Sequence, residues 1–89
     1  MQETTTARLK RMRMRAWRRG MKEMDLILGP FADARLAGLE DETLTLLDGM
    51  MAENDQDLYQ WVTGQSAAPP RFAALIAQIA AFARTRRAV

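Results

Sequence analysis

Apolar residues recur along this chain at the spacing of an α-helix, and no segment shows the strict alternation of a half-buried strand. The clearest case is Met24, Ile27, Leu28 and Phe31, which stand at positions i, i+3, i+4 and i+7. A chain of 89 residues buries enough surface for one small core. We therefore predict an all-α fold, a compact bundle of about five short helices in a single domain over residues 1–89.

Capping residues and helix breakers divide the chain into five predicted helices, with approximate extents 4–17, 20–36, 40–51, 54–64 and 70–87. We expect Gly20 to end the first helical segment and Gly29-Pro30 to kink the second. Gly64 is expected to stop the fourth helix. The other candidates for helix starts are Thr4 to Thr6, Glu40, Asn54 or Asp55, and Pro70.

The predicted core takes one apolar stripe from each helix. Its members are expected to be Leu9, Met12, Ala16, Met24, Ile27, Leu28, Phe31, Leu36, Leu44, Leu47, Met50, Met51, Leu58, Trp61, Val62, Phe72, Leu75, Ile76, Ile79 and Phe82 or Ala83. At the end of the last helix, Arg84, Arg86 and Arg87 carry charge that complements a helix C-terminus.

Two residue types that are absent from the sequence limit its chemistry. Without cysteine the chain forms neither a disulfide nor a thiolate metal site, which is typical of a reducing compartment. Without histidine it lacks the commonest general base and the commonest metal ligand. No apolar run approaches the roughly 20 residues that span a bilayer. We expect neither an enzyme, nor a metal site, nor a membrane-inserted segment.

Charge is segregated along the chain, although the net charge is only +2. Residues 1–22 carry a net +7, residues 23–57 a net −9 and residues 58–89 a net +4. The arginines from Arg8 to Arg19 are typical of a solvated helix face, of a phosphate-binding surface or of a mitochondrial transit peptide. We expect this segment to belong to the fold. Nucleic-acid binding is the alternative function. It ranks second because only Trp17 interleaves with the arginines, whereas proteins that bind single strands usually offer several stacking platforms.

The segment "RRGMKEMD" admits two interpretations. In the first, Gly20 is a helix N-cap and Glu23, three residues later, reaches back to a free backbone N–H. That interpretation leaves Arg19 unexplained, since a positive charge gains nothing beside a helix N-terminus. In the second, the segment is a recognition patch. There Gly20 leaves room for a partner, Arg19 binds a carboxylate or phosphate, and Glu23 accepts hydrogen bonds.

A second cluster, "DQDLYQW", contains Asp55, Asp57 and Trp61. We favour a helix start plus a core contact, with Asp55 or Asn54 as cap, Asp57 near the helix dipole and Trp61 packed inward. The two aspartates are similar to the start of a calcium loop, but its glycine and terminal glutamate are missing.

With both segments in place, the chain resembles the SdhE family, also called succinate dehydrogenase assembly factor 2, over nearly its whole length. The family's RGxxE signature falls on Arg19, Gly20 and Glu23, followed by Asp25. Its D-x-D-L-x-x-W pattern falls on Asp55, Asp57, Leu58 and Trp61. The combination is far more specific than RGxxE alone.

The resemblance implies a five-helix bundle that promotes covalent attachment of FAD to the flavoprotein subunit of succinate dehydrogenase. We assign partner binding to Arg18, Arg19, Gly20, Glu23, Asp25, Asp55 and Asp57. FAD is then the client's cofactor and is not stably bound by this chain. The histidine that accepts it must also belong to the client, because this chain has none. Fumarate reductase is a further possible client.

No long leader precedes the predicted domain, which favours a bacterial cytoplasmic protein over an unprocessed mitochondrial one. We expect the protein to be a monomer when free.

Overall fold

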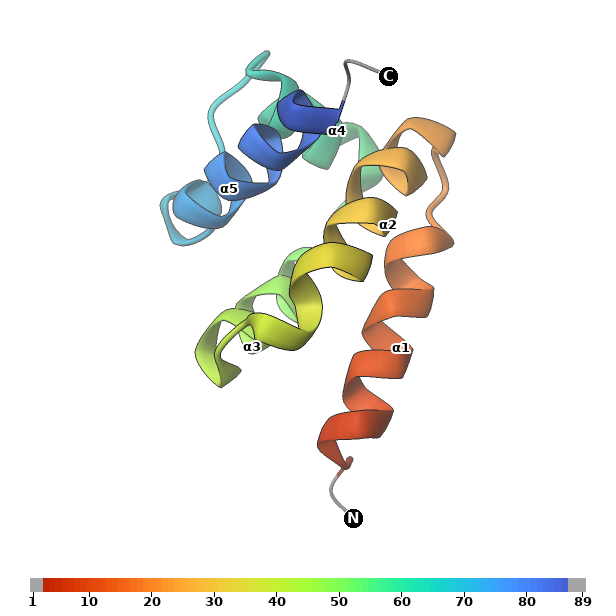
Figure 1. The fold of residues 1–89 in the computed structure, drawn as a ribbon. Helices are drawn as coiled ribbons and strands as arrows, with labels where there is room; N and C mark the ends of the chain where they lie inside the picture. Colours follow the sequence, from red (N-terminus) through yellow and green to blue (C-terminus); the bar gives the residue numbers. More distant parts are fainter. Residues whose placement is uncertain (1–2, 87–89) are drawn as a thin grey trace.

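The structure, a computed structural model, describes residues 3–86, which form five α-helices and one short 3-10 helix (Figure 1). No strand occurs within these residues, so the all-α prediction is confirmed. The elements in chain order are α1 (Thr5–Trp17), α2 (Lys22–Arg35), η1 (Leu36–Gly38), α3 (Asp41–Met50), α4 (Asp55–Thr63) and α5 (Pro70–Arg86).

The arginine-rich helix α1 is part of the packed fold. Its N-cap is Thr4, whose hydroxyl oxygen accepts a hydrogen bond from the backbone N–H of Ala7 at 3.1 Å. Met12 and Ala16 are buried against the rest of the protein, and α1 runs antiparallel beside α2 (Figure 1). Residues 5–17 therefore contribute to the core, as expected.

The second helix begins one residue later than predicted. Met21 is its N-cap, so the interpretation in which Gly20 caps this helix is wrong, and Glu23 is the second helical residue instead of the third. The helix then continues through Pro30 and ends at Arg35, followed directly by η1. Its approximate extent is confirmed.

The next two helices begin and end as their sequences predict. Glu40 is the N-cap of α3, although its side chain makes no capping hydrogen bond. Asn54 caps α4 by accepting from the N–H of Gln56 at 2.8 Å, which makes Asp55 the first helical residue. Gly64 ends α4 with a φ of 81°, a left-handed conformation that glycine adopts without strain.

Helix α5 begins at Pro70 and packs on α2, α3 and α4, which closes the bundle. The buried core consists of Met12, Ala16, Met24, Leu28, Phe31, Ala32, Leu36, Leu44, Leu47, Met50, Met51, Leu58, Phe72, Leu75, Ile76 and Ile79. Leu9, Ile27, Trp61, Val62 and Phe82 are partly buried against it. The predicted core stripes are thus confirmed, and Ala32 joins them. Arg87, which we expected at the end of the last helix, lies outside the described residues.

Within residues 3–86, none of the helices combines the length and the apolar character that crossing a membrane requires.

Candidate functional site

Residues 18–21 connect α1 to α2, and a single carboxylate from α4 holds this connector in place. Oδ2 of Asp55 accepts hydrogen bonds from the backbone N–H groups of Gly20 at 2.7 Å and Met21 at 3.1 Å. Oδ1 of Asp55 accepts from Nε of Arg19 at 2.9 Å and lies 2.8 Å from its Nη2. We call these four residues, Asp55 with Arg19, Gly20 and Met21, the Asp55 clamp.

The two charged side chains of the clamp are largely shielded from water, and Arg19 makes further contacts with Asp25 and Glu53. Only 8% of the Arg19 side chain and 11% of the Asp55 side chain are exposed. The backbone N–H of Arg19 donates to Oδ1 of Asp25, and its Nη2 also approaches the carbonyl oxygen of Glu53 at 3.5 Å. The clamp accounts for Arg19, which the sequence left unexplained, because its guanidinium pairs with Asp55 beside the start of α2. Asp55 also satisfies the N–H of Met21, the N-cap of α2, whose own side chain makes no capping bond.

Gly20 is not required by the backbone geometry of the connector. Its φ is not positive, and a Cβ built on it would meet only Oδ2 of Asp55, at the ordinary contact distance of 3.6 Å. The residue is exposed. The absence of a side chain therefore leaves free space outside the protein and relieves no crowding within it.

Glu23 and Arg18 flank the clamp and are exposed to solvent. Neither side chain makes a hydrogen bond or an ion pair with any other residue in the range 3–86. The capping bond from the Glu23 side chain back to the N-cap does not form within residues 3–86. The reason is that Met21 is the N-cap, so Glu23 lies one position too early for that bond. Asp57 is also exposed, on the first turn of α4. Three of the seven predicted site residues, Arg19, Asp25 and Asp55, thus use their side chains to hold the connector.

An open hollow lies beside the connector. Arg15, Arg18 and Arg19 line it on one side, and residues 51–56 line it on the other. Arg15 is tied to this second segment, because its Nη2 donates to the carbonyl oxygen of Met51 at 3.2 Å. Within residues 3–86, Arg15 pairs with Asp48 and Arg19 pairs with Asp55, whereas Arg18 forms no ion pair.

Sequence analysis did not single out Leu26, which lies one turn beyond Glu23 on α2. Its side chain is 58% exposed, the largest value among the exposed large hydrophobic residues. It lines a largely apolar hollow together with Ile27, Pro30 and Val62, and Arg84 and Arg86 also border that hollow. The signal was present in the sequence, since Leu26 falls outside the Met24–Phe31 stripe and so has no place in the core.

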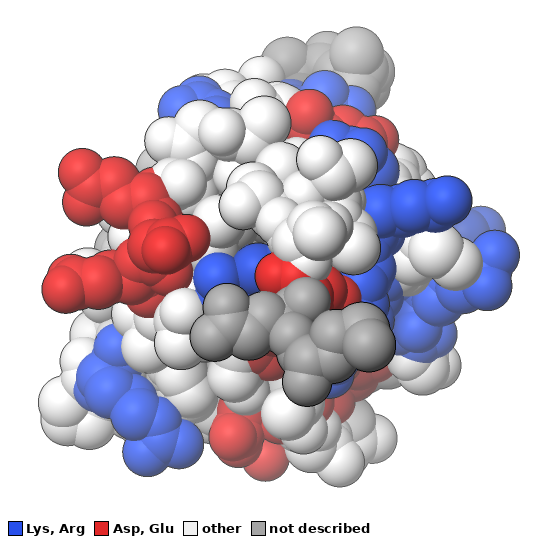
Figure 2. Space-filling view, turned by 90° about the horizontal axis from the view of Figure 1, so that it is seen from below, with Lys and Arg blue, Asp and Glu red and all other residues white. Residues whose placement is uncertain are grey.

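The arginines of α1 are largely paired with acidic residues of other segments. Asp48 of α3 accepts two bonds from Arg11, at 2.9 and 2.7 Å, and one from Arg15 at 3.1 Å. The hydrogen bonds from Arg11, followed by the charges of Arg11, Arg15 and Arg8, hold the pKa of Asp48 below its ordinary value. Figure 2, which views the protein from below, shows basic side chains along the right and at the lower left, acidic ones projecting at the upper left, and the two signs mixed at the centre.

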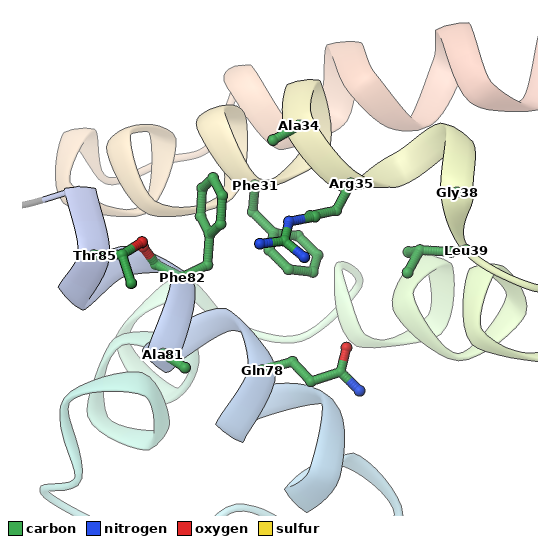
Figure 3. A pocket seen from close by; sticks show the side chains of 9 residues that line it. All are labelled: Phe31, Ala34, Arg35, Gly38, Leu39, Gln78, Ala81, Phe82 and Thr85. Atoms are coloured by element: carbon green, nitrogen blue, oxygen red, sulfur yellow. The ribbon is translucent and has the colours of Figure 1, made fainter.

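Another hollow lies between the end of α2, η1 and α5 (Figure 3). The rings of Phe31 and Phe82 meet edge to face with centroids 5.7 Å apart, and the guanidinium of Arg35 lies 5.2 Å from the Phe82 centroid. These groups already contact one another, and nothing about them assigns a cofactor. Within residues 3–86 no three acidic, histidine or cysteine side chains are grouped so that they would hold a metal ion.

Comparison with known proteins finds one family and several relatives. The model of a family described as "Sdh5: Flavinator of succinate dehydrogenase" matches residues 10–83. The "FAD assembly factor SdhE" of Shewanella oneidensis is 34% identical over 65 residues, which cover 72% of this chain and 79% of that protein.

Mitochondrial relatives are also similar but longer. The "Succinate dehydrogenase assembly factor 2, mitochondrial" of Aspergillus terreus is 42% identical over 62 residues, or 70% of this chain and 21% of that protein. The protein of the same name from Drosophila grimshawi is 33% identical over 67 residues, or 73% of this chain and 46% of that protein. The chain therefore spans less than half the length of these two relatives.

Proposed function

Because this chain belongs to the family of succinate dehydrogenase flavinators, we propose that it binds the flavoprotein subunit of succinate dehydrogenase and promotes covalent attachment of FAD to that subunit. The observation that carries the proposal is the exposure of Arg18 and Glu23 on either side of the Asp55 clamp, which holds the connector in one conformation. A charged pair of this kind, displayed from an ordered turn, suits recognition of a partner surface.

In this proposal the protein acts as a chaperone and not as an enzyme. The histidine that accepts the flavin is a residue of the client, since this chain contains none. The chain binds the immature subunit and holds its flavin and acceptor histidine in a geometry where they react with each other. Restricting the two reactants to a productive arrangement accelerates a reaction without supplying a nucleophile.

Glu23 and Arg18 are the residues that we assign to direct contact with the client. The carboxylate of Glu23 accepts hydrogen bonds from client donors, and the guanidinium of Arg18 binds a client carboxylate or phosphate. Gly20 lies between them and has no side chain, so the client backbone approaches the connector closely. Asp57, also assigned to partner binding, is exposed on the first turn of α4.

The alternative function, nucleic-acid binding, is disfavoured because arginines of α1 already form ion pairs within the protein. Arg11 and Arg15 are engaged by Asp48, and Arg8 lies 3.6 Å from Asp41. Each such pair would have to open, or remain partly neutralised, when phosphates bind. Titration of RNA or DNA binding with salt tests this alternative. A slope that corresponds to many released ions would favour it over the assembly factor.

Covalent flavin on the client provides the direct test. The flavoprotein subunit is matured with and without this protein, denatured, and examined for flavin fluorescence that stays with the chain. We expect strong fluorescence that requires this protein and is lost with Glu23→Ala. Glu42→Ala, which removes an exposed carboxylate from α3, is the matched control and should leave the fluorescence intact. Fluorescence that is indifferent to the presence of this protein would overturn the proposal.

A further inference from the structure

We propose that Asp55 is a positioning residue for client recognition and that Arg19 acts through Asp55, without touching the client itself. This inference rests on the proposed function, since it concerns the surface that binds the flavoprotein. It divides the RGxxE signature into two groups. Glu23 contacts the partner directly, whereas Arg19 pairs with Asp55 inside the protein and so helps to fix the orientation of Glu23.

The geometry of Arg19 is that of an internal group. Its side chain is 8% exposed, and both Nε and Nη2 face the carboxylate of Asp55. To bind a client carboxylate, Arg19 would have to leave Asp55. That would strip an anion that is itself only 11% exposed of its counter-charge, which is strongly unfavourable. A partner gains nothing by breaking this pair when the guanidinium of Arg18 is exposed next to it.

The geometry of Asp55 explains how one residue determines the shape of the connector. Its two oxygens are divided between separate tasks, with Oδ1 on the Arg19 side chain and Oδ2 on the backbone N–H groups of Gly20 and Met21. Those two N–H groups belong to the residues that lead directly into α2, where Glu23 lies. The carboxylate therefore holds the backbone of the connector and the start of α2 against α4.

Loss of the clamp should weaken binding through disorder of the connector. Residues 18–21 are not helical, so without Asp55 they must be ordered when the client binds, at the expense of affinity. We expect a loss of about 10-fold or more in affinity for Asp55→Ala, because several side chains and backbone groups would have to be immobilised.

A double-mutant cycle tests whether Arg19 acts through Asp55. The affinity of the purified flavoprotein subunit is measured for the full chain, for Arg19→Ala, for Asp55→Ala and for the double variant. We expect each single change to weaken binding, and the double variant to bind no more weakly than the weaker single one. If the two losses multiply, Arg19 contributes to the client independently of Asp55, and the inference is overturned.

Two further variants separate positioning from a general loss of stability. Asp55→Asn retains an oxygen that accepts from Gly20 and Met21 but loses the charge that holds Arg19, so it should restore part of the affinity lost in Asp55→Ala. Asp48→Ala removes a different interhelical carboxylate that pairs with arginines of α1. It should lower the melting temperature without weakening binding. Equal affinity losses in Asp48→Ala and Asp55→Ala would show that the clamp acts only through stability.

The backbone amides give a readout that does not depend on the client. In the full chain we expect slow hydrogen exchange at Gly20 and Met21, and fast exchange at both in Asp55→Ala. Unchanged exchange would contradict the clamp. The cycle also distinguishes the two proposals from each other. A wild-type chain that fails to bind the flavoprotein overturns the proposed function and this inference with it, whereas normal binding with multiplying losses overturns this inference alone.

Discussion

The indole ring of Trp17 lies directly against the backbone of Gly29, so that a Cβ on residue 29 would overlap three ring carbons of Trp17. The ring is fixed further by its Nε1–H, which donates to the carboxylate of Asp33 at 3.2 Å. Gly29 is thus the place where α1 and α2 come close enough for a tryptophan from one to cover the backbone of the other. One face of the Trp17 ring is thus covered by α2, although 39% of the residue remains exposed.

Gly29→Ala should destabilise the protein by roughly 1–3 kcal/mol, the usual cost of inserting a methyl group into a packed contact. This loss is expected even though helix propensity favours alanine over glycine by about 1 kcal/mol. Gly49→Ala is the matched control, since it also lies in a helix and its Cβ would meet nothing within 4 Å. It should be neutral or stabilising. Urea unfolding measures both, and similar free energies of unfolding for the two variants would refute the contact.

Asp48→Asn should reveal a pH-dependent contribution to stability. The pKa of Asp48 is lowered in the folded protein by its hydrogen bonds to Arg11 and by the nearby arginines. Because the pKa is lower in the folded than in the unfolded state, the ionised carboxylate stabilises the native state at any pH above the unfolded pKa of about 4. This contribution disappears as the pH falls through the folded pKa.

We therefore expect Asp48→Asn to cost about 1.5–3 kcal/mol at pH 7, the range for a hydrogen bond to a charged group. The difference from wild type should shrink below pH of about 4. Thermal melts from neutral to acidic pH provide the measurement. A difference that stays constant down to the lowest pH would contradict the assignment.

Gly20→Arg should abolish client binding and leave the fold intact. The free space at Gly20 lies outside the protein, so a long side chain is accommodated by the chain itself but blocks close approach of a partner. Gly20→Ala is the control. It should bind with a much smaller loss, because its Cβ meets Asp55 at an ordinary distance.

Circular dichroism and thermal melting separate these two effects at Gly20. We expect both variants to unfold within about 0.5 kcal/mol of wild type, as surface substitutions usually do. If Gly20→Arg instead lost as much stability as binding, the role of Gly20 would lie in starting α2 and not in client recognition.

Leu26→Ser should weaken client binding by about 10-fold, the effect expected when an apolar anchor at an interface is truncated. Its exposed side chain lies on the α2 face that begins with Glu23 and continues to Pro30, next to the apolar hollow. The stability of the protein should change little, because the residue contributes little to the core. Met14→Ser, at an exposed apolar residue of α1, is the control and should bind normally. Equal effects at the two positions would argue against a specific surface at Leu26.

Much of the fold was predictable because it depends on neighbours along the chain. Thr4, Asn54 and Gly64 mark helix ends through bonds that span two to four residues. The buried faces follow from a spacing of 3.6 residues, which explains why the predicted core stripes agree with the structure. The start of α2 was the exception. Gly20 and Met21 find their hydrogen-bond acceptor on Asp55, 34 to 35 residues away, so local capping rules placed the boundary one residue too early.

The candidate site shows the same division. Sequence alone supplied Arg19, Gly20 and Glu23 as a group, and Asp55 and Asp57 as a second group, but favoured a local capping role for Asp55. The structure joins the two groups and separates the exposed Glu23 from the shielded Arg19.

By itself, then, the sequence determined the number of helices, most of their ends and the faces that they bury. Each of these depends on side chains within one or two turns of each other. Only the tertiary structure decided that Asp55 clamps the connector, that Trp17 covers Gly29 and that Asp48 gathers the arginines of α1. Those contacts join different helices, and their distances depend on how the helices cross, which the spacing of residues along a single helix does not encode.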